Sequence, residues 1–289
     1  MKVLITGKGG QLAWELENTA DIGHQLIVLS RNELDISHAV EVKDMIALHQ
    51  PDVVINAAAY TAVDKAETEQ DKAFAVNDIG AKNLAKACKL LNIRLLHVST
   101  DFVFDGTKTT PYQTDDVVNP LGVYGASKLA GDLGVMQILP NSVIVRTAWV
   151  YSQHGNNFVK TMLRLMAEKP QLGIVYDQVG TPTWAAGLAK WLWAVAVKPE
   201  VSGVFHWTDA GVASWYDFAV AIQELATEKG ILTNAIPISA IPASQYPTPA
   251  QRPSFSVIDK TSAESAAGMK SVHWRQQLSS MMDRLKISV

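Results

Sequence analysis

The stretch KVLITGKGGQLA, residues 2–13, decides the class of fold to which this chain belongs. Its first five residues are mostly aliphatic or β-branched, which predicts a strand, and a helical pattern begins at Leu12. Between the two, Gly7 allows a tight turn and Gly10 lets backbone approach a diphosphate. A strand, a glycine turn and a helix in this order are the context that a dinucleotide-binding fingerprint requires. We therefore predict that N–H groups at the start of the helix face the phosphates of a dinucleotide.

Strands and helices alternate through the rest of the first half. The patterns predict strands at 25–29, 52–56, 94–98 and 142–145, and helices at 39–49, 70–91 and 121–137. This alternation predicts an α/β fold with a doubly wound parallel sheet of the Rossmann type. Ligands in such sheets bind beyond the carboxyl ends of the strands. Candidate site residues at these ends are Gly7, Arg31, Ala57, Thr100 and Trp149.

The helix expected at 121–137 carries Tyr124 and Lys128, which share one helix face because they are four residues apart. A neighbouring ammonium favours the ionised phenol, so we expect the pKa of Tyr124 to fall from its usual value of about 10 toward neutral pH. Tyr124 is then a candidate general acid toward a carbonyl oxygen, to which Thr100 could also donate a hydrogen bond. Both have ordinary alternatives, because Tyr-x-x-x-Lys pairs are common on helix surfaces and a threonine after a strand often caps a turn.

Beyond residue 150 the alternation becomes less regular. The patterns predict helices at 156–167, 185–197, 214–229 (with Ser214 as its cap) and 272–286, and extended segments at 172–176 and 204–207. The proline-rich segment 237–253 is expected to be a loop rather than a helix. We predict a dinucleotide-binding domain at 1–150, to which 181–200 returns, and a smaller C-terminal substrate-binding lobe at 151–289. The tryptophans other than Trp149 are interpreted as packing residues.

The composition excludes several classes of partner. A net charge of −3 gives no reason to expect nucleic acid, and no membrane-spanning or signal segment is recognised.

The single cysteine, Cys88, cannot form an internal disulfide and lies in an apolar pattern, so we expect a buried structural thiol in a reducing compartment. The histidines show no metal-ligand spacing. We therefore expect a cytoplasmic protein.

Six further stretches occur in order along the chain: NAAAYTAVDKAE at 56–67, STDFVF at 99–104, YGASK at 124–128, RTAWVY at 146–151, GNNF at 155–158 and YPTPAQRP at 246–253. Together with the glycine turn they resemble the extended short-chain dehydrogenase/reductase family, over nearly the whole length. The resemblance implies that Thr100, Tyr124 and Lys128 form a catalytic triad. It also implies NAD(P)H-dependent reduction of the C4 ketone of a small-molecule nucleotide sugar, dTDP-4-dehydro-6-deoxy-L-mannose, to dTDP-L-rhamnose.

The same resemblance implies which residues bind cofactor and substrate. Expected cofactor contacts are Gly7, Gly10, Gln11, Leu12, Arg31, Asp35, Ile36, Ala57, Ala58, Ala59, Tyr60 and Lys128. Expected substrate contacts are Thr100, Asp101, Trp149, Asn157 and Arg252. Arginine presents a planar fork suited to phosphate oxygens; the alternative is that Arg252 is a solvated loop residue.

Arg31 bears on the choice of cofactor. Many relatives have an acidic residue after the second strand, which binds the ribose 2′-hydroxyl and would repel a 2′-phosphate. Here that position is Ser30-Arg31, and arginine forms charge-assisted bonds to phosphate. We therefore predict that NADPH is preferred and NADH accepted. The alternative is that Arg31 stacks on the adenine and leaves both cofactors equally usable.

The chain departs from the family pattern at two further positions. Ala13 replaces a usual glycine, which alanine is small enough to allow. Some relatives form a dimer bridged by a divalent metal that glutamates bind; Glu15 is present here, but Ala186 stands where a second ligand is expected. We therefore predict no metal site, and a monomer or weak homodimer.

Other functions of the same fold are open at this stage. The chain could be another nucleotide-sugar reductase or epimerase, whereas Phe102 disfavours a dehydratase because those enzymes usually have glutamate there. A non-catalytic regulatory subunit of methionine adenosyltransferase also uses this fold.

Overall fold

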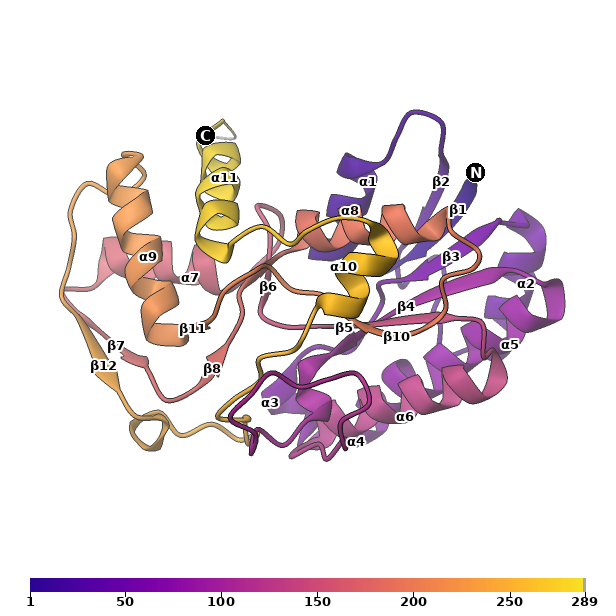
Figure 1. The fold of residues 1–289 in the computed structure, drawn as a ribbon, viewed down its shortest axis with the longest axis horizontal. Helices are drawn as coiled ribbons and strands as arrows, with labels where there is room; N and C mark the ends of the chain where they lie inside the picture. The colour runs from indigo at the N-terminus through magenta and orange to yellow at the C-terminus, as the bar shows by residue number, and fades with distance from the viewer. Residues whose placement is uncertain (288–289) are drawn as a thin grey trace.

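The computed structural model describes residues 1–287. Its centre is a six-stranded, all-parallel sheet with the strand order β10-β5-β4-β3-β1-β2 (Figure 1). The strands are β1 (Lys2–Thr6), β2 (Gln25–Leu29), β3 (Val53–Asn56), β4 (Arg94–Thr100), β5 (Val143–Thr147) and β10 (Gly203–His206). The predicted doubly wound parallel sheet is confirmed. Its direction of winding reverses between β1 and β3, and such a reversal is where ligands bind in this class of fold.

Helices cover both faces of the sheet because successive side chains of a strand point to opposite faces. Val3 and Ile5 pack with α1 (Gln11–Thr19) and α8 (Ala185–Ala196), and α10 (Thr261–Ala267) joins the same cluster. Leu4 faces the other way. It belongs to a second cluster with α2 (Ala39–His49), α5 (Ala81–Leu91) and α6 (Val123–Ile138).

A second lobe lies beside the sheet and has its own apolar core (Figure 1). Its helices are α7 (Phe158–Glu168), α9 (Trp215–Glu228) and α11 (Trp274–Ile287). Three short strand pairs accompany them: parallel β7–β12 (Leu172–Val175 with Ile238–Ile241), antiparallel β8–β11 (Val179–Gly180 with Ala213–Ser214) and parallel β6–β9 (Val150–Tyr151 with Thr183–Trp184). The predicted cap of α9 is confirmed, because the Ser214 hydroxyl accepts a bond from the Asp217 N–H in a full capping box.

Two predicted elements differ in the structure. The single helix expected at 70–91 is α4 (Gln70–Phe74), then a π-helical segment (Ala75–Gly80), then α5. The segment 237–253 is not all loop, because it contains β12 and a 3₁₀ turn, Ala243–Gln245. Prolines at 237 and 242 flank β12 without removing a donor from within it, which is where strands tolerate them.

Short elements complete the fold: α3 (Val63–Ala66) and a 3₁₀ turn after β4 (Asp101–Val103). α8 packs on the sheet, and β10, from beyond residue 200, pairs with β5. The division of the chain near residue 150 stays a prediction.

Cys88 is fully buried in α5, and burial raises the pKa of its thiol to about 12. The expected burial of this thiol is thereby confirmed. Within residues 1–287 no helix combines the length and the apolar character needed to cross a bilayer.

Candidate active site

The carboxyl ends of β1 to β5 open into one cleft with a volume of about 810 Å³. The structure places every site residue predicted from the sequence along this cleft. They are Gly7, Gly10, Gln11, Leu12, Arg31, Asp35, Ile36, Ala57, Ala58, Ala59, Tyr60, Thr100, Asp101, Tyr124, Lys128, Trp149, Asn157 and Arg252.

The glycine turn after β1 is closed by its own backbone. Gly7 has a φ of +84°, in the left-handed region that favours glycine, and accepts a bond from the Gly10 N–H at 3.0 Å. A Cβ atom on Gly7 would lie 2.8 Å from the carbonyl oxygen of Ala57. α1 then begins without a side-chain cap, so its first N–H groups are available to an anion. The turn therefore fits the diphosphate of a dinucleotide.

Three side chains with acid–base chemistry meet where β4 ends and α6 begins. Tyr124 lies in the first turn of α6, Lys128 one turn later, and Thr100 ends β4. The Tyr124 phenol pairs with the Thr100 side chain, and the single proton of the Thr100 hydroxyl is donated to Asp101 Oδ1 at 3.1 Å. Lys128 is only 2% exposed, and its ammonium donates to the carbonyl of Val98 at 2.7 Å. Tyr124, Thr100 and Lys128 thus all line the cleft.

Burial sets the protonation states of this group. It raises the pKa of Tyr124 to about 12; the Thr100 hydrogen bond opposes this rise, and the carboxylates of Asp101 and Asp132 add to it. Burial also lowers the pKa of Lys128 to about 8, against the attraction of Asp132. The expectation that Lys128 would lower the pKa of Tyr124 is therefore wrong. Helical spacing indicates that a charge is near, but it does not show how much water both groups lose.

Comparison with known proteins identifies the family of this chain. The family model for the RmlD substrate binding domain matches residues 1–287. This chain belongs to the RmlD family. It is 42% identical over 284 residues to the dTDP-4-dehydrorhamnose reductase of Aggregatibacter actinomycetemcomitans, a match that covers 96% of this chain and 97% of that protein.

Solved structures of the RmlD-type reductases have the same fold. The dTDP-4-dehydrorhamnose reductase of Clostridium acetobutylicum superposes with a TM-score of 0.93 at 39% identity, covering 99% of this chain and 100% of that one. The Bacillus anthracis reductase, solved in complex with NADP, has a TM-score of 0.91 at 32% identity, covering 100% of this chain and 99% of that one.

At the outer end of the RmlD-family cleft, Arg31 follows β2 with its side chain 77% exposed. Its Nε donates to Asp35 Oδ2 at 3.2 Å, while Asp35 Oδ1 accepts from the backbone and hydroxyl of Ser37. The Glu33 carboxylate accepts from both the backbone N–H and the hydroxyl of Ser30. The positive charge at this end of the cleft is thus tethered by Asp35 and remains open to solvent.

The second lobe contributes aromatic rings to the cleft. Trp149 stacks on Trp215 with ring centroids 3.5 Å apart and planes 7° apart, and its backbone has a φ of +46°. A positive φ on a bulky residue is strained, and strain of this kind accumulates at functional sites. Trp215, interpreted from the sequence as a packing residue, lines the cleft as well. Its position at the start of α9 could not be related to the cleft from the sequence.

Two predicted substrate residues already have partners. Asn157 caps α7 by accepting from the Lys160 N–H, and its amide donates to Gln11 Oε1 at 3.0 Å. The guanidinium of Arg252 donates to both carboxylate oxygens of Asp64, at 3.0 and 2.9 Å. Asn157 therefore connects the glycine turn to the second lobe, and Arg252 ties the chain's late loop to α3.

Asn77, in the π-helical segment, supports the cleft from behind. It accepts from the Tyr60 N–H at 2.8 Å, donates to the Tyr60 carbonyl at 3.0 Å and donates to the Ser127 hydroxyl at 3.0 Å. One amide thus joins the segment after β3 to the helix that carries Tyr124. No local signal distinguishes Asn77 from the other polar residues of the helix expected at 70–91, such as Asp78 and Asn83.

Glu15, the potential metal ligand, is fully buried. Its Oε1 accepts from the Ser152 hydroxyl at 2.7 Å and from the Trp184 indole at 3.1 Å, and Arg284 lies 3.9 Å from its Oε2. Ala186 is buried too. In the part of the chain that the structure describes, no group of three or more His, Cys, Asp or Glu side chains is arranged to hold a metal.

Proposed function

We propose that this chain is an NAD(P)H-dependent dTDP-4-dehydrorhamnose reductase, which reduces the C4 ketone of dTDP-4-dehydro-6-deoxy-L-mannose to give dTDP-L-rhamnose. The observation that carries the proposal is the 42% identity, over 96% of the chain, to a reductase of that name. The relatives do not favour an epimerase or a regulatory subunit. The cleft supports the proposal because Thr100, Tyr124 and Lys128 all line it.

We propose that Thr100, Tyr124 and Lys128 are the catalytic residues. With a pKa of about 12, Tyr124 holds its proton at neutral pH, so it can donate that proton to the substrate carbonyl oxygen. The Thr100 hydroxyl donates to Asp101 Oδ1 in this structure and would turn its single proton to the same carbonyl oxygen when substrate binds. Lys128, one turn away, stabilises the phenolate that is left behind. Bound NADPH would supply the hydride.

The cofactor lies, in this proposal, along the glycine turn and the small residues that follow β3. Gly7, Gly10, Gln11 and Leu12 hold the diphosphate, and Ala57 to Ala59 and Tyr60 provide a flat wall. Asp35 and Ile36 bind near the adenosine and Arg31 binds the 2′-phosphate, so that NADPH is preferred and NADH accepted. A relative solved with NADP supports nicotinamide binding in general.

The substrate then occupies the part of the cleft nearer the second lobe. Asp101 and Trp149 face the sugar, while Asn157 and Arg252 position the loops around the nucleotide. A cytoplasmic location, a monomer or weak homodimer, and the lack of nucleic-acid or membrane partners remain predictions from the sequence.

Tyr124→Phe tests the proposal. Removing a positioned proton donor should lower kcat by roughly 10²- to 10⁴-fold, whereas the affinity for NADPH should be nearly unchanged. The assay follows the loss of nicotinamide absorbance with NADPH and the keto sugar nucleotide. Tyr176→Phe is the control, since Tyr176 is half exposed and does not line the cleft. Undiminished turnover in Tyr124→Phe would refute the mechanism.

A further inference from the structure

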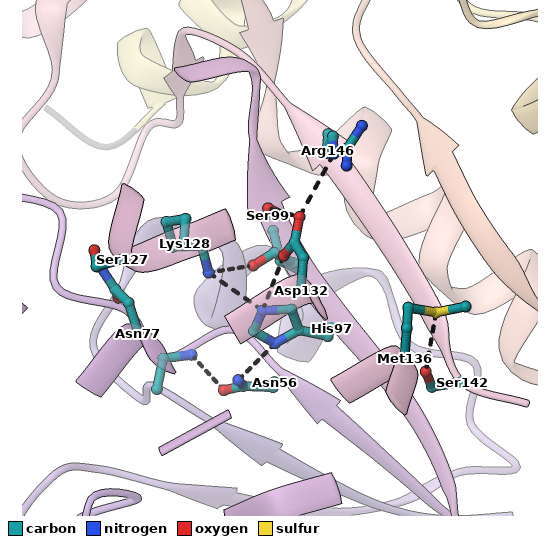
Figure 2. Close-up of polar contacts among 12 residues, drawn as sticks. Asn56, Asn77, His97, Ser99, Ser127, Lys128, Asp132, Met136, Ser142 and Arg146 are labelled. Carbon is teal, nitrogen blue, oxygen red and sulfur yellow. Dashed lines mark hydrogen bonds and ion pairs between the residues drawn. The ribbon is translucent and has the colours of Figure 1, made fainter. Parts of the chain in front are cut away.

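A buried polar network lies directly behind Lys128 (Figure 2). It is built from strands β1, β3, β4 and β5 and from helix α6, and each of its residues is at most 5% exposed. Its members are Thr6, Asn56, His97, Ser99, Lys128, Asp132 and Arg146. Burying so many polar groups is costly unless each finds a partner, and only Lys128 among them has an assigned role.

The orientation of Asn56 is fixed by its neighbours. Its Oδ1 accepts from the Thr6 hydroxyl at 2.7 Å and from the Ala58 N–H at 3.2 Å. The opposite orientation would place the amide NH₂ against the Ala58 N–H, donor to donor. The Asn56 NH₂ therefore faces His97 Nδ1, at 2.9 Å.

This contact fixes the state of His97. An amide NH₂ can only donate, so Nδ1 of the imidazole must accept, and the ring proton is on Nε2. His97 cannot take a second proton without setting two donors against each other. Burial and the nearby Lys128 ammonium also hold the pKa of His97 well below its usual value. His97 is thus a neutral spacer.

The Nε2 side of His97 faces both Lys128 Nζ, at 3.4 Å, and Asp132 Oδ1, at 3.7 Å. Asp132 Oδ2 accepts from the Ser99 hydroxyl at 2.7 Å and lies 3.5 Å from the Nε of Arg146. The Asp132 carboxylate is therefore held in place from the strands, with its second oxygen directed toward His97.

Few charges reach Lys128 from other elements. Asp132 is on its own helix, His97 is on β4, and Arg146 of β5 lies beyond the Asp132 carboxylate. Asp101, after β4, accepts from the Thr100 hydroxyl instead. The carboxylate that offsets the loss of water around the ammonium is that of Asp132.

We propose that Asp132 is a positioning residue for Lys128: acting beside the neutral, Asn56-locked His97, it keeps the buried ammonium charged and fixed one helical turn from Tyr124. The inference rests on the proposed function, in which Lys128 stabilises the phenolate. It also assigns a purpose to Asn56, which selects the histidine tautomer. The network sets the pH above which the ammonium is lost.

Two substitutions test this, and they act in opposite directions. Asp132→Asn removes the carboxylate with little change of shape. The alkaline limb of the kcat/KM profile should move to lower pH by about one unit. At a fixed pH above the limb, kcat/KM of the variant should then be about tenfold below that of wild type. Asn56→Asp places an acceptor opposite His97 Nδ1, so the ring proton can move to Nδ1 and leave Nε2 as an acceptor facing the ammonium. Its alkaline limb should move to higher pH.

Controls separate positioning from general damage. Asp132→Glu should restore the limb. Asp209→Asn removes another buried carboxyl, which lies outside the cleft and accepts from the Trp184 N–H. Burial raises the pKa of Asp209 to about 8. The alkaline limb of kcat/KM in this variant should match that of wild type. If Asp132→Asn does not fold, Asn56→Asp decides the question.

The affinity for NADPH, measured by fluorescence over the same pH range, is a second readout. A folded variant whose limbs coincide with wild type in both measurements overturns the inference. A third outcome is that neither wild type nor the variants turn over the keto sugar, while the pH limb of NADPH binding still differs between the variants and wild type. That result would leave the positioning role standing and refute the proposed substrate.

Discussion

Arg31→Ala is the most direct test of how the cleft distinguishes NADPH from NADH. A hydrogen bond to a charged group contributes ~1.5–3 kcal/mol, and the exposure of Arg31, 77%, argues for the lower half of that range. The i,i+4 ion pair with Asp35, which is lost at the same time, contributes about 0.3–0.5 kcal/mol at a solvent-exposed site. A net loss of about 1–2 kcal/mol corresponds to roughly a 5- to 30-fold loss of affinity.

We therefore expect Arg31→Ala to lower kcat/KM for NADPH by about 5- to 30-fold and to leave the value for NADH within about twofold. The difference should shrink at high salt, because an exposed charge is screened. Initial rates with each cofactor measure both quantities. Arg164→Ala is the control, since Arg164 forms a similar i,i+4 pair with Glu168 but lies outside the cleft. A wild type that favours NADH, or an equal loss with both cofactors, would show that Arg31 does not read the 2′-phosphate.

Two further predictions concern stability. In Gly131→Ala the new Cβ would lie 2.1 Å from the backbone oxygen of Asn77, so we expect a loss of about 1–3 kcal/mol in urea unfolding; Gly23→Ala, with nothing within 4 Å, should cost far less, and equal costs would contradict the packing argument. Burial, with Arg146 nearby, lowers the pKa of His206 to about 3, so below its unfolded pKa of about 6.5 the unfolded chain binds a proton that the native chain does not. The free energy of unfolding should fall as the pH drops from 6.5 toward 3, and His206→Gln should weaken this dependence; identical slopes for the two proteins would count against it.

The sequence was informative wherever one local signal determines the outcome. Apolar runs and the glycines at 7 and 10 predicted the strands and the turn, and strand ends in a parallel sheet meet at one edge. That is why residues as distant as Gly7 and Trp149 could be placed together. The spacing of Tyr124 and Lys128 predicted that they share a helix face, but their pKa values depend on burial, which spacing does not contain.

Other features depend on distant partners or on small changes of helix period. The bond between Arg252 and Asp64 joins residues 188 positions apart, and nothing local to either predicts it. The π-helical segment differs from an α-helix in the spacing of its hydrogen bonds, to which the apolar pattern of 70–91 is insensitive. β12 is only four residues long, and its flanking prolines were typical of a loop.

The order of synthesis matters for the edge of the central sheet. β5 ends at Thr147, and the strand that pairs with its outer edge, β10, begins at Gly203. At about 5–20 residues per second, a ribosome needs several seconds to make the intervening segment. During that time the hydrogen-bonding groups of an apolar strand are open to pairing with another nascent chain. Expression fragments that stop before His206 therefore carry a ready template for aggregation, and truncations meant to isolate the nucleotide-binding half should retain β10.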